Sequence, residues 1–146
     1  MRRWLGAVLV FAIVTSAVSV SALPIVGGKK KEYNLGSSPA SGFRSYDDNI
    51  GGFMVHGFNE EAATLTISSR ALGEAQWEPN PDAGDARACQ LGESYALKAG
   101  ETCSYKVINR AKKREYRIDV KWRREVKDGR IPSVVLVVDR DETKLQ

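Results

Sequence analysis

The chain has 146 residues, of which 42% are hydrophobic, and its 22 bases and 18 acids give a net charge of +4. This length suffices for one domain with a single core. Two of the bases lie at the extreme N-terminus, and the other 20 bases against 18 acids leave a charge of only +2, which does not predict a nucleic-acid partner.

The N-terminal segment predicts export. Arg2 and Arg3 precede the apolar run 4–14, and small residues follow up to Val20-Ser21-Ala22, which is the pattern of a secretory signal peptide. The apolar run is too short for a spanning helix, although an uncleaved anchor is an alternative. No cysteine lies near the cleavage point, so lipidation is not expected. We therefore predict a signal peptide over 1–22, cleavage near Ala22 and a periplasmic protein.

The next segment, residues 23–44, is rich in glycine, serine and lysine and has no period. It predicts a flexible lead-in with at most one short strand. We expect a single domain over 45–140 and a polar tail over 141–146.

The first predicted strand, 53–58, alternates weakly between flanking glycines. After the turn at 59–61, residues 63–68 place Ala63, Leu65 and Ile67 on one face and hydroxyl side chains on the other. These two segments predict a hairpin.

Residues 71–88 contain two prolines, two glycines and four acids, which predict a long exposed loop. Its one large aromatic residue, Trp77, is either folded back onto the sheet or displayed to a partner as an anchor with a charged rim. The second hypothesis makes this segment the candidate partner-binding site, comprising Glu74, Trp77, Glu78, Asp82 and Asp85.

The only two cysteines, Cys89 and Cys103, stand in a chain that is expected to be exported, so we predict a disulfide between them. A loop of this size stabilises the fold by roughly 3 kcal/mol in the chain-entropy model. Two thiols and one distant histidine do not provide a metal site, and no cofactor is expected.

The C-terminal part predicts further strands at 95–98 and 102–108. Strict alternation over 115–123 predicts a half-buried strand, Asp128-Gly129 a hairpin turn and the run 133–138 a more central strand. No segment has a helical period over ten residues. The fold class is therefore all-β, a small antiparallel β-sandwich of about six to eight strands with one disulfide.

The charges are divided unequally along the chain. Residues 45–97 carry two bases and nine acids, whereas residues 98–130 carry twelve bases and five acids. Either the two parts lie side by side and neutralise each other, or they form a polarised surface that attracts a charged partner. A secondary candidate surface consists of basic residues that could contact anionic headgroups or an acidic protein, namely Arg117, Lys121, Arg123 and Arg124.

The sequence contains no nucleophile elbow, phosphate-binding glycine loop or zinc-protease motif. The one histidine, His56, follows the pair Asp47-Asp48, but nothing nominates a nucleophile or groups that would stabilise developing charge. We therefore predict that Asp47 and Asp48 form a turn, that His56 faces solvent or is satisfied by a hydrogen bond, and that the protein is not an enzyme. A small exported hydrolase that uses His56 is kept as an alternative.

The stretch 42–58 resembles the N-terminal signature of a bacterial envelope family of unknown function. The matching positions there are Gly42-Phe43, Ile50, Phe53, Val55 and Gly57. Cys103 and Val120-Lys121-Trp122 match further on, so the resemblance covers roughly 41–123. Many members are lipoproteins with adjacent cysteines, whereas this chain has neither feature.

Members of that family resemble immunity proteins of type VI secretion phospholipase effectors. The resemblance implies a periplasmic protein that binds the cognate effector and either occludes its active site or blocks its activation. We expect a monomer in a one-to-one complex. The alternative is an exported structural or adhesion module that binds anionic lipid or polysaccharide.

Overall fold

The computed structural model describes residues 25–146, and side chains from Gly28 onward. The predicted signal peptide therefore lies outside the described residues. Between residues 25 and 146, no helix is long and apolar enough to cross a membrane. The described chain forms ten strands: β1 Ile25–Asn34, β2 Gly42–Asp47, β3 Gly51–Asn59, β4 Thr64–Ala71, β5 Gln76–Pro79, β6 Arg87–Ala88, β7 Ser94–Lys98, β8 Cys103–Asn109, β9 Arg114–Glu125 and β10 Ser133–Lys144.

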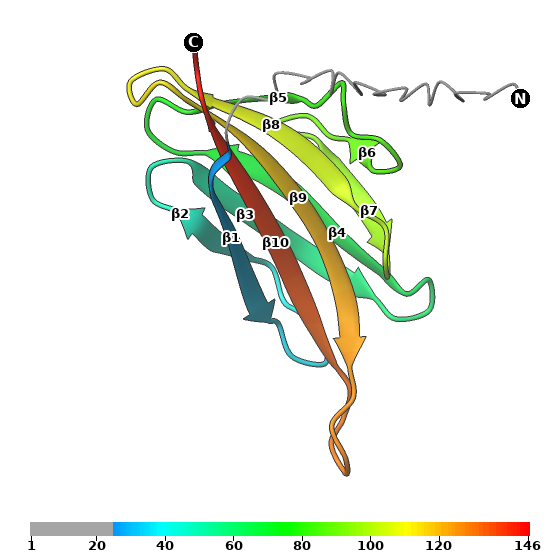
Figure 1. Cartoon of the computed structure of the whole chain (residues 1–146). Coiled ribbons are helices and arrows are strands. Elements are labelled where there is room, and N and C mark those ends of the chain that lie inside the picture. Colours follow the sequence, from blue (N-terminus) through cyan, green and yellow to red (C-terminus); the bar gives the residue numbers. More distant parts are fainter. Residues whose placement is uncertain (1–24) are drawn as a thin grey trace, which may run out of the picture.

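The strands form two sheets that pack face to face, and the predicted all-β sandwich is confirmed (Figure 1). One sheet has six strands in the order β1-β10-β9-β8-β5, with β6 beside β8. The other has four in the order β2-β3-β4-β7. All pairs are antiparallel except the two-residue β6 on β8. The predicted disulfide joins Cys89 to Cys103, whose Cα atoms are 5.5 Å apart.

The core lies between the inner faces of the sheets. As the alternation of β9 predicts, Tyr116, Ile118, Val120 and Trp122 are all buried. Across the gap, the rings of Phe53 and Tyr105 lie 5.7 Å apart. Aromatic contacts of this kind stabilise a core beyond their buried area.

Strand β10 is central, as its β-branched run predicts, and even its outward-facing Val135 and Val137 are buried. Glu32 on β1 and Arg123 on β9 lie on either side of β10 and form two hydrogen bonds of 3.1 Å. Because the two partners flank β10, their ion pair spans its outer face and contributes to covering these valines.

The structure corrects three boundaries. The predicted lead-in contains β1, a full strand at the edge of the six-stranded sheet, and the predicted tail continues β10 to Lys144. The predicted long loop contains β5 and β6. Lysine-rich and proline-containing strands occur at sheet edges, so a sequence rule that demands alternation or excludes proline misses them.

Candidate protein-binding surfaces

The most exposed apolar side chains lie at the tip of the β9–β10 hairpin. Strand pairing ends at Glu125 and Ser133, and residues 126–132, here called the hairpin tip, project beyond both sheets (Figure 1). Val126 is 72% exposed and Ile131 is 79% exposed, the two highest values for large hydrophobic residues in the described part of the chain. Two such exposed side chains on one projecting turn make the hairpin tip a candidate interaction site.

A basic environment surrounds the hairpin tip. Residues 123–132 carry four bases and two acids, a charge of +2, of which Glu32 of β1 offsets one by pairing with Arg123. The turn itself is closed by a backbone hydrogen bond of 3.0 Å from Arg130 to Lys127, with Gly129 at φ 70°. That φ lies in the left-handed region, which favours glycine. The tip therefore has a defined turn, an apolar surface and an excess of positive charge.

Three of the four residues of the predicted basic surface lie on one face of β9, and the fourth does not. Lys121 is exposed on the outer face of β9 by alternation with the buried Trp122, and Arg117 and Arg123 share that face. Arg124 alternates to the other side, where its guanidinium lies 5.3 Å from the Phe58 ring. Arg117 and Arg123 are paired with carboxylates, whereas Lys121 has no ion pair among the described side chains.

The expectation that Trp77 is displayed to a partner is wrong. Its side chain is 6% exposed and its indole Nε1 donates a hydrogen bond of 3.0 Å to the carbonyl of Ile50. The ring packs edge-on against Phe53 and Tyr105, at 5.3 and 5.1 Å. Trp77 is thus a core residue, as in the alternative in which it folds back onto the sheet.

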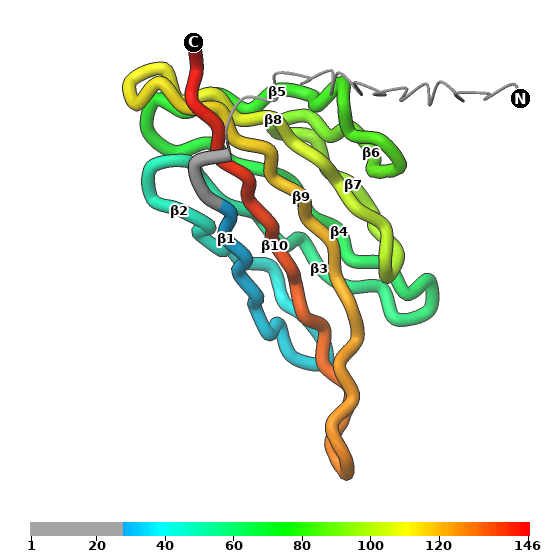
Figure 2. Tube along the Cα trace, viewed as in Figure 1, coloured from blue at the N-terminus to red at the C-terminus, as the bar shows by residue number. Residues whose placement is uncertain are grey.

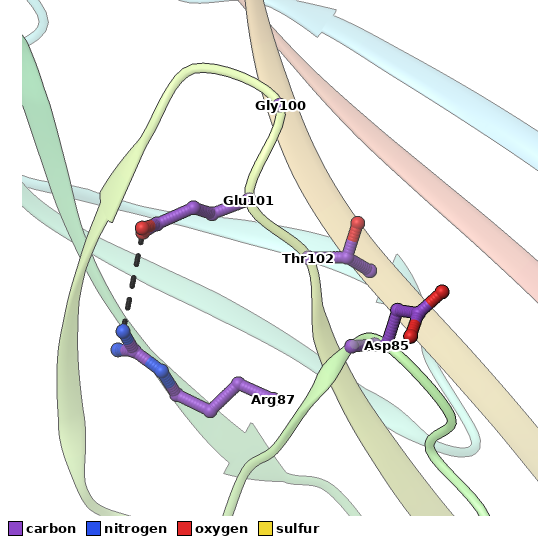
Figure 3. A pocket seen from close by; sticks show the side chains of 6 residues that line it. Asp85, Arg87, Gly100, Glu101 and Thr102 are labelled. Carbon is purple, nitrogen blue, oxygen red and sulfur yellow. Dashed lines mark ion pairs between the residues drawn. The ribbon is translucent and has the colours of Figure 1, made fainter.

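The acids around Trp77 have different environments. Glu74, Asp82 and Asp85 are exposed, whereas Glu78 on β5 is half-buried. Asp85 lines an open cavity of about 480 Å³ beside the β7–β8 turn, together with Arg87, Glu101 and Thr102 (Figure 3). Arg87 pairs with Glu101 at 3.9 Å, and Asp85 points away from it (Figure 3). The exposed acids remain candidates for partner contact without the aromatic anchor.

The two oppositely charged parts of the sequence adjoin each other in the fold but form few close ion pairs. No acid of 45–97 lies within 4.0 Å of a base of 98–130. Strands β5 and β6 also lie at the opposite end of the molecule from the hairpin tip (Figure 1). Glu78 of β5 nevertheless lies directly opposite Lys106 of β8, and Asp82, Lys106 and Arg117 line one cavity, so the two parts are neighbours without close ion pairs.

His56 lies on the outer face of the four-stranded sheet, at a bulge between the pairs Val55–Ile67 and Gly57–Thr66. It is exposed, as predicted, and its Nε2 lies 2.7 Å from the hydroxyl of Ser68 and 3.5 Å from that of Ser94. The predicted hydrogen bond is confirmed, but its partner was not predictable, because the bulge that aligns His56 with Ser68 has no residue signature.

Asp47, the last residue of β2, and Asp48 lie away from His56, where the chain turns from β2 to β3. The carboxylate of Asp47 accepts a hydrogen bond of 2.9 Å from the backbone N–H of Asn49, which confirms the predicted turn. Asp47 also pairs with Arg140 of the other sheet at 3.0 Å, a contact that the sequence did not indicate. Within residues 25–146, no group of three or more histidine, cysteine or acidic side chains is placed to hold a metal ion.

No protein-family model matches this chain, and no curated protein or solved structure shows significant similarity to it. The fold and surfaces define a class only: a disulfide-bonded β-sandwich with a projecting, apolar and basic hairpin.

Proposed function

We propose that this protein is a periplasmic immunity protein that binds an antibacterial type VI secretion effector, a phospholipase, and occludes its active site with the hairpin tip. The observation that carries the proposal is the exposure of Val126 and Ile131 on an element that projects beyond the sandwich. The family resemblance of residues 41–123 supports the choice of effector class.

The tip has the chemistry that such a cleft would accept. An enzyme that acts on phospholipids has to bind acyl chains, so its substrate cleft needs an apolar lining. A two-stranded hairpin is narrow enough to enter a cleft without the sheets behind it. Burial of Val126 and Ile131 there would contribute about 1.5–3 kcal/mol for each side chain.

The charges support a specific and rapid encounter. The hairpin end carries four bases against two acids, and with Glu32 of β1, which pairs with Arg123, it keeps an excess of positive charge. A polarised surface of this kind orients an oppositely charged partner and raises the association rate at low salt. We expect a cleft with an apolar floor and an acidic rim in a one-to-one complex.

The test is protection of living cells. A strain that lacks this gene is mixed with its type VI-active parent, and survival is measured with plasmids that encode the wild-type chain, Val126→Ser with Ile131→Ser, or Leu91→Ser. Leu91 is a matched control because it is also exposed, at 41%, and lies outside the hairpin tip. The wild type and Leu91→Ser should restore survival, whereas the tip variant should fail because its affinity falls by more than about 100-fold.

Two outcomes would contradict the proposal separately. If the strain without the gene survives as well as its parent, the protein confers no immunity. If the tip variant protects as well as the wild type, the immunity proposal stands and the hairpin is not the inhibitory element.

A second candidate function is contact with an anionic membrane surface, which the basic and apolar tip also favours. It predicts that the purified protein sediments with phosphatidylglycerol vesicles and that salt abolishes the binding. Under the immunity proposal, the tip variant loses protection whether or not the protein binds such vesicles.

A further inference from the structure

At the end of the sandwich opposite the hairpin tip, Arg140 of β10 lies in the gap between the two sheets. Its side chain is only 5% exposed. One terminal nitrogen donates to the carboxylate of Asp47 on β2 at 3.0 Å, and the other approaches Glu142 at 3.5 Å. The guanidinium also lies over the rings of Tyr116 and Tyr46, at 5.3 and 6.0 Å. These contacts fix its position and leave it little freedom to move.

One hydrogen-bond donor of the buried Arg140 guanidinium has no acceptor. Nε of Arg140 is buried and has no hydrogen-bond partner among the described residues. A buried charged donor without an acceptor is uncommon in proteins and calls for a physical explanation such as strain, an ordered water or an ion. Arg140 lines two open cavities, of about 310 and about 570 Å³, that meet at this residue.

The lining of the two cavities is strongly basic, with six bases against two acids: Lys29, Lys30, Lys31, Lys112, Arg114 and Arg140 against Asp47 and Glu142. The two acids are already engaged by Arg140 and Arg114. Among the described side chains, neither Lys29 nor Lys112 has a carboxylate within 4.0 Å. Both lysines line the larger cavity.

When no anion is bound, the position of Lys29 beside Arg140 destabilises the fold. It lies directly opposite Arg140 in the β1–β10 pairing, so the two side chains leave the same face of the sheet. Like charges in directly opposite positions destabilise a strand pair. An anion bound between them would convert this repulsion into attraction for both cations.

From these observations we propose that this cavity, at the junction of β1, β2 and β10, is a binding site for a phosphate group that carries two negative charges. Lys29 and Lys112 neutralise the charge of the phosphate, and the fixed guanidinium of Arg140 adds positive charge at the wall of the cavity. Asp47 and Glu142 hold the two arginines in place. A dianion matches two unpaired ammonium groups better than a single carboxylate does.

The site is independent of the proposed function, because it lies at the far end of β10 from the hairpin tip (Figure 2). The ligand could be a free phosphate compound or the phosphomonoester of a lipid such as phosphatidic acid. Both sources offer the same chemistry, and the arms of the experiment distinguish them.

The test uses inorganic pyrophosphate as a probe, titrated at constant ionic strength and followed by NMR of the folded wild-type chain. We expect saturable shifts of the amides of residues 29–31, 47–49 and 112–114. Lys29→Gln and Lys112→Gln should each weaken binding about tenfold, because each removes one charged contact. Lys98→Gln is the matched control, since Lys98 is an exposed strand lysine outside both cavities.

The absence of saturable shifts in the wild type would overturn the proposal. So would an equal loss in Lys29→Gln and Lys98→Gln, because the effect would then reflect overall charge. Neither lysine is part of the core, so the variants should fold, and Lys29→Gln should be at least as stable as the wild type. Sedimentation with phosphatidylcholine vesicles, with and without phosphatidic acid, assigns the source. Binding that needs both phosphatidic acid and Lys29 identifies a headgroup, and pyrophosphate binding alone identifies a soluble phosphate.

Discussion

The indole Nε1 of Trp122 donates a hydrogen bond of 2.7 Å to the backbone carbonyl of Leu97. Trp122 belongs to β9 of the six-stranded sheet and Leu97 to β7 of the four-stranded sheet, so this bond joins the two layers of the sandwich. Both residues are buried. A buried donor and a buried acceptor that satisfy each other also fix how the sheets are positioned.

Trp122→Phe should therefore destabilise the fold by about 2–4 kcal/mol, because it leaves the Leu97 carbonyl without its donor and removes buried volume. The measurement is urea unfolding with the disulfide intact. Tyr116→Phe is the control, since Tyr116 is also buried on the inner face of β9 and its hydroxyl donates no hydrogen bond within the described chain. Equal unfolding free energies for the two variants would show that the inter-sheet hydrogen bond contributes nothing.

The disulfide should contribute about 3 kcal/mol, because it closes a loop between cysteines that are 14 positions apart. Cys89→Ala with Cys103→Ala should lower the urea midpoint by a corresponding amount, and the reduced wild type should unfold at a similar midpoint. Alanine is the suitable replacement because both positions are fully buried and a serine hydroxyl there would lack a partner. If oxidised and reduced wild type unfold together, the bridge does not stabilise this fold.

Elements with a clear period were predictable from the sequence. The alternation of β9 gave its buried face, from Tyr116 to Trp122, and the β-branched run 133–138 gave the central position of β10. Strand β1 was missed because its inward-facing Lys29 and Lys31 reach the open corner of the sandwich rather than its core. Lys31, for example, donates to the carbonyls of Ser45 and Tyr46 at the edge of β2.

The candidate surfaces were less predictable, because exposure depends on which elements pack together. Trp77 lies in a stretch whose two prolines, two glycines and four acids predict a loop, but Pro79 ends a short edge strand where proline is tolerated. Val126 and Ile131 lie in a stretch that predicts only a turn, and their exposure follows from how far the hairpin extends beyond the sheets. The Asp47–Arg140 contact joins residues 93 positions apart, and no local pattern indicates it.

The stability of the protein should fall in alkaline solution. Burial raises the pKa of Tyr46 to about 12, above the value of about 10 in an unfolded chain. Between these values the unfolded chain loses the proton first, so this contribution is fully present below about pH 10 and is lost as the pH rises to about 12. Burial also raises the pKa of Tyr105 and Tyr116, in the same direction.

In Tyr46→Phe the free energy of unfolding should therefore decrease less steeply between about pH 9 and about pH 12. The reason is that one of the titrating tyrosine hydroxyls has been removed. Urea unfolding at several pH values measures the slope, and absorbance of the tyrosinate ion follows the titration. Identical slopes in the variant and the wild type would mean that Tyr46 titrates normally in the folded protein.

Replacement of only one member of the Asp47–Arg140 ion pair should destabilise the fold strongly. Arg140 is 5% exposed and Asp47 is 25% exposed, so Asp47→Asn leaves a buried guanidinium with a weaker partner. Removal of one partner from a buried pair destabilises proteins by about 3–5 kcal/mol. We expect a loss at the lower end of this range, because Glu142 also contacts Arg140.

Replacement of both members should cost much less than the sum of the single changes. Asp47→Asn with Arg140→Met removes the buried charge together with its partner and leaves an apolar chain between the rings of Tyr46 and Tyr116, and such replacements of buried pairs are often close to neutral. The four proteins form a double-mutant cycle, measured by urea unfolding at neutral pH. A coupling free energy near zero would show that Asp47 and Arg140 act independently, and their contact would then not join the two sheets energetically. A large coupling would locate a second point, besides Trp122 and Leu97, at which the layers of the sandwich are fixed to each other.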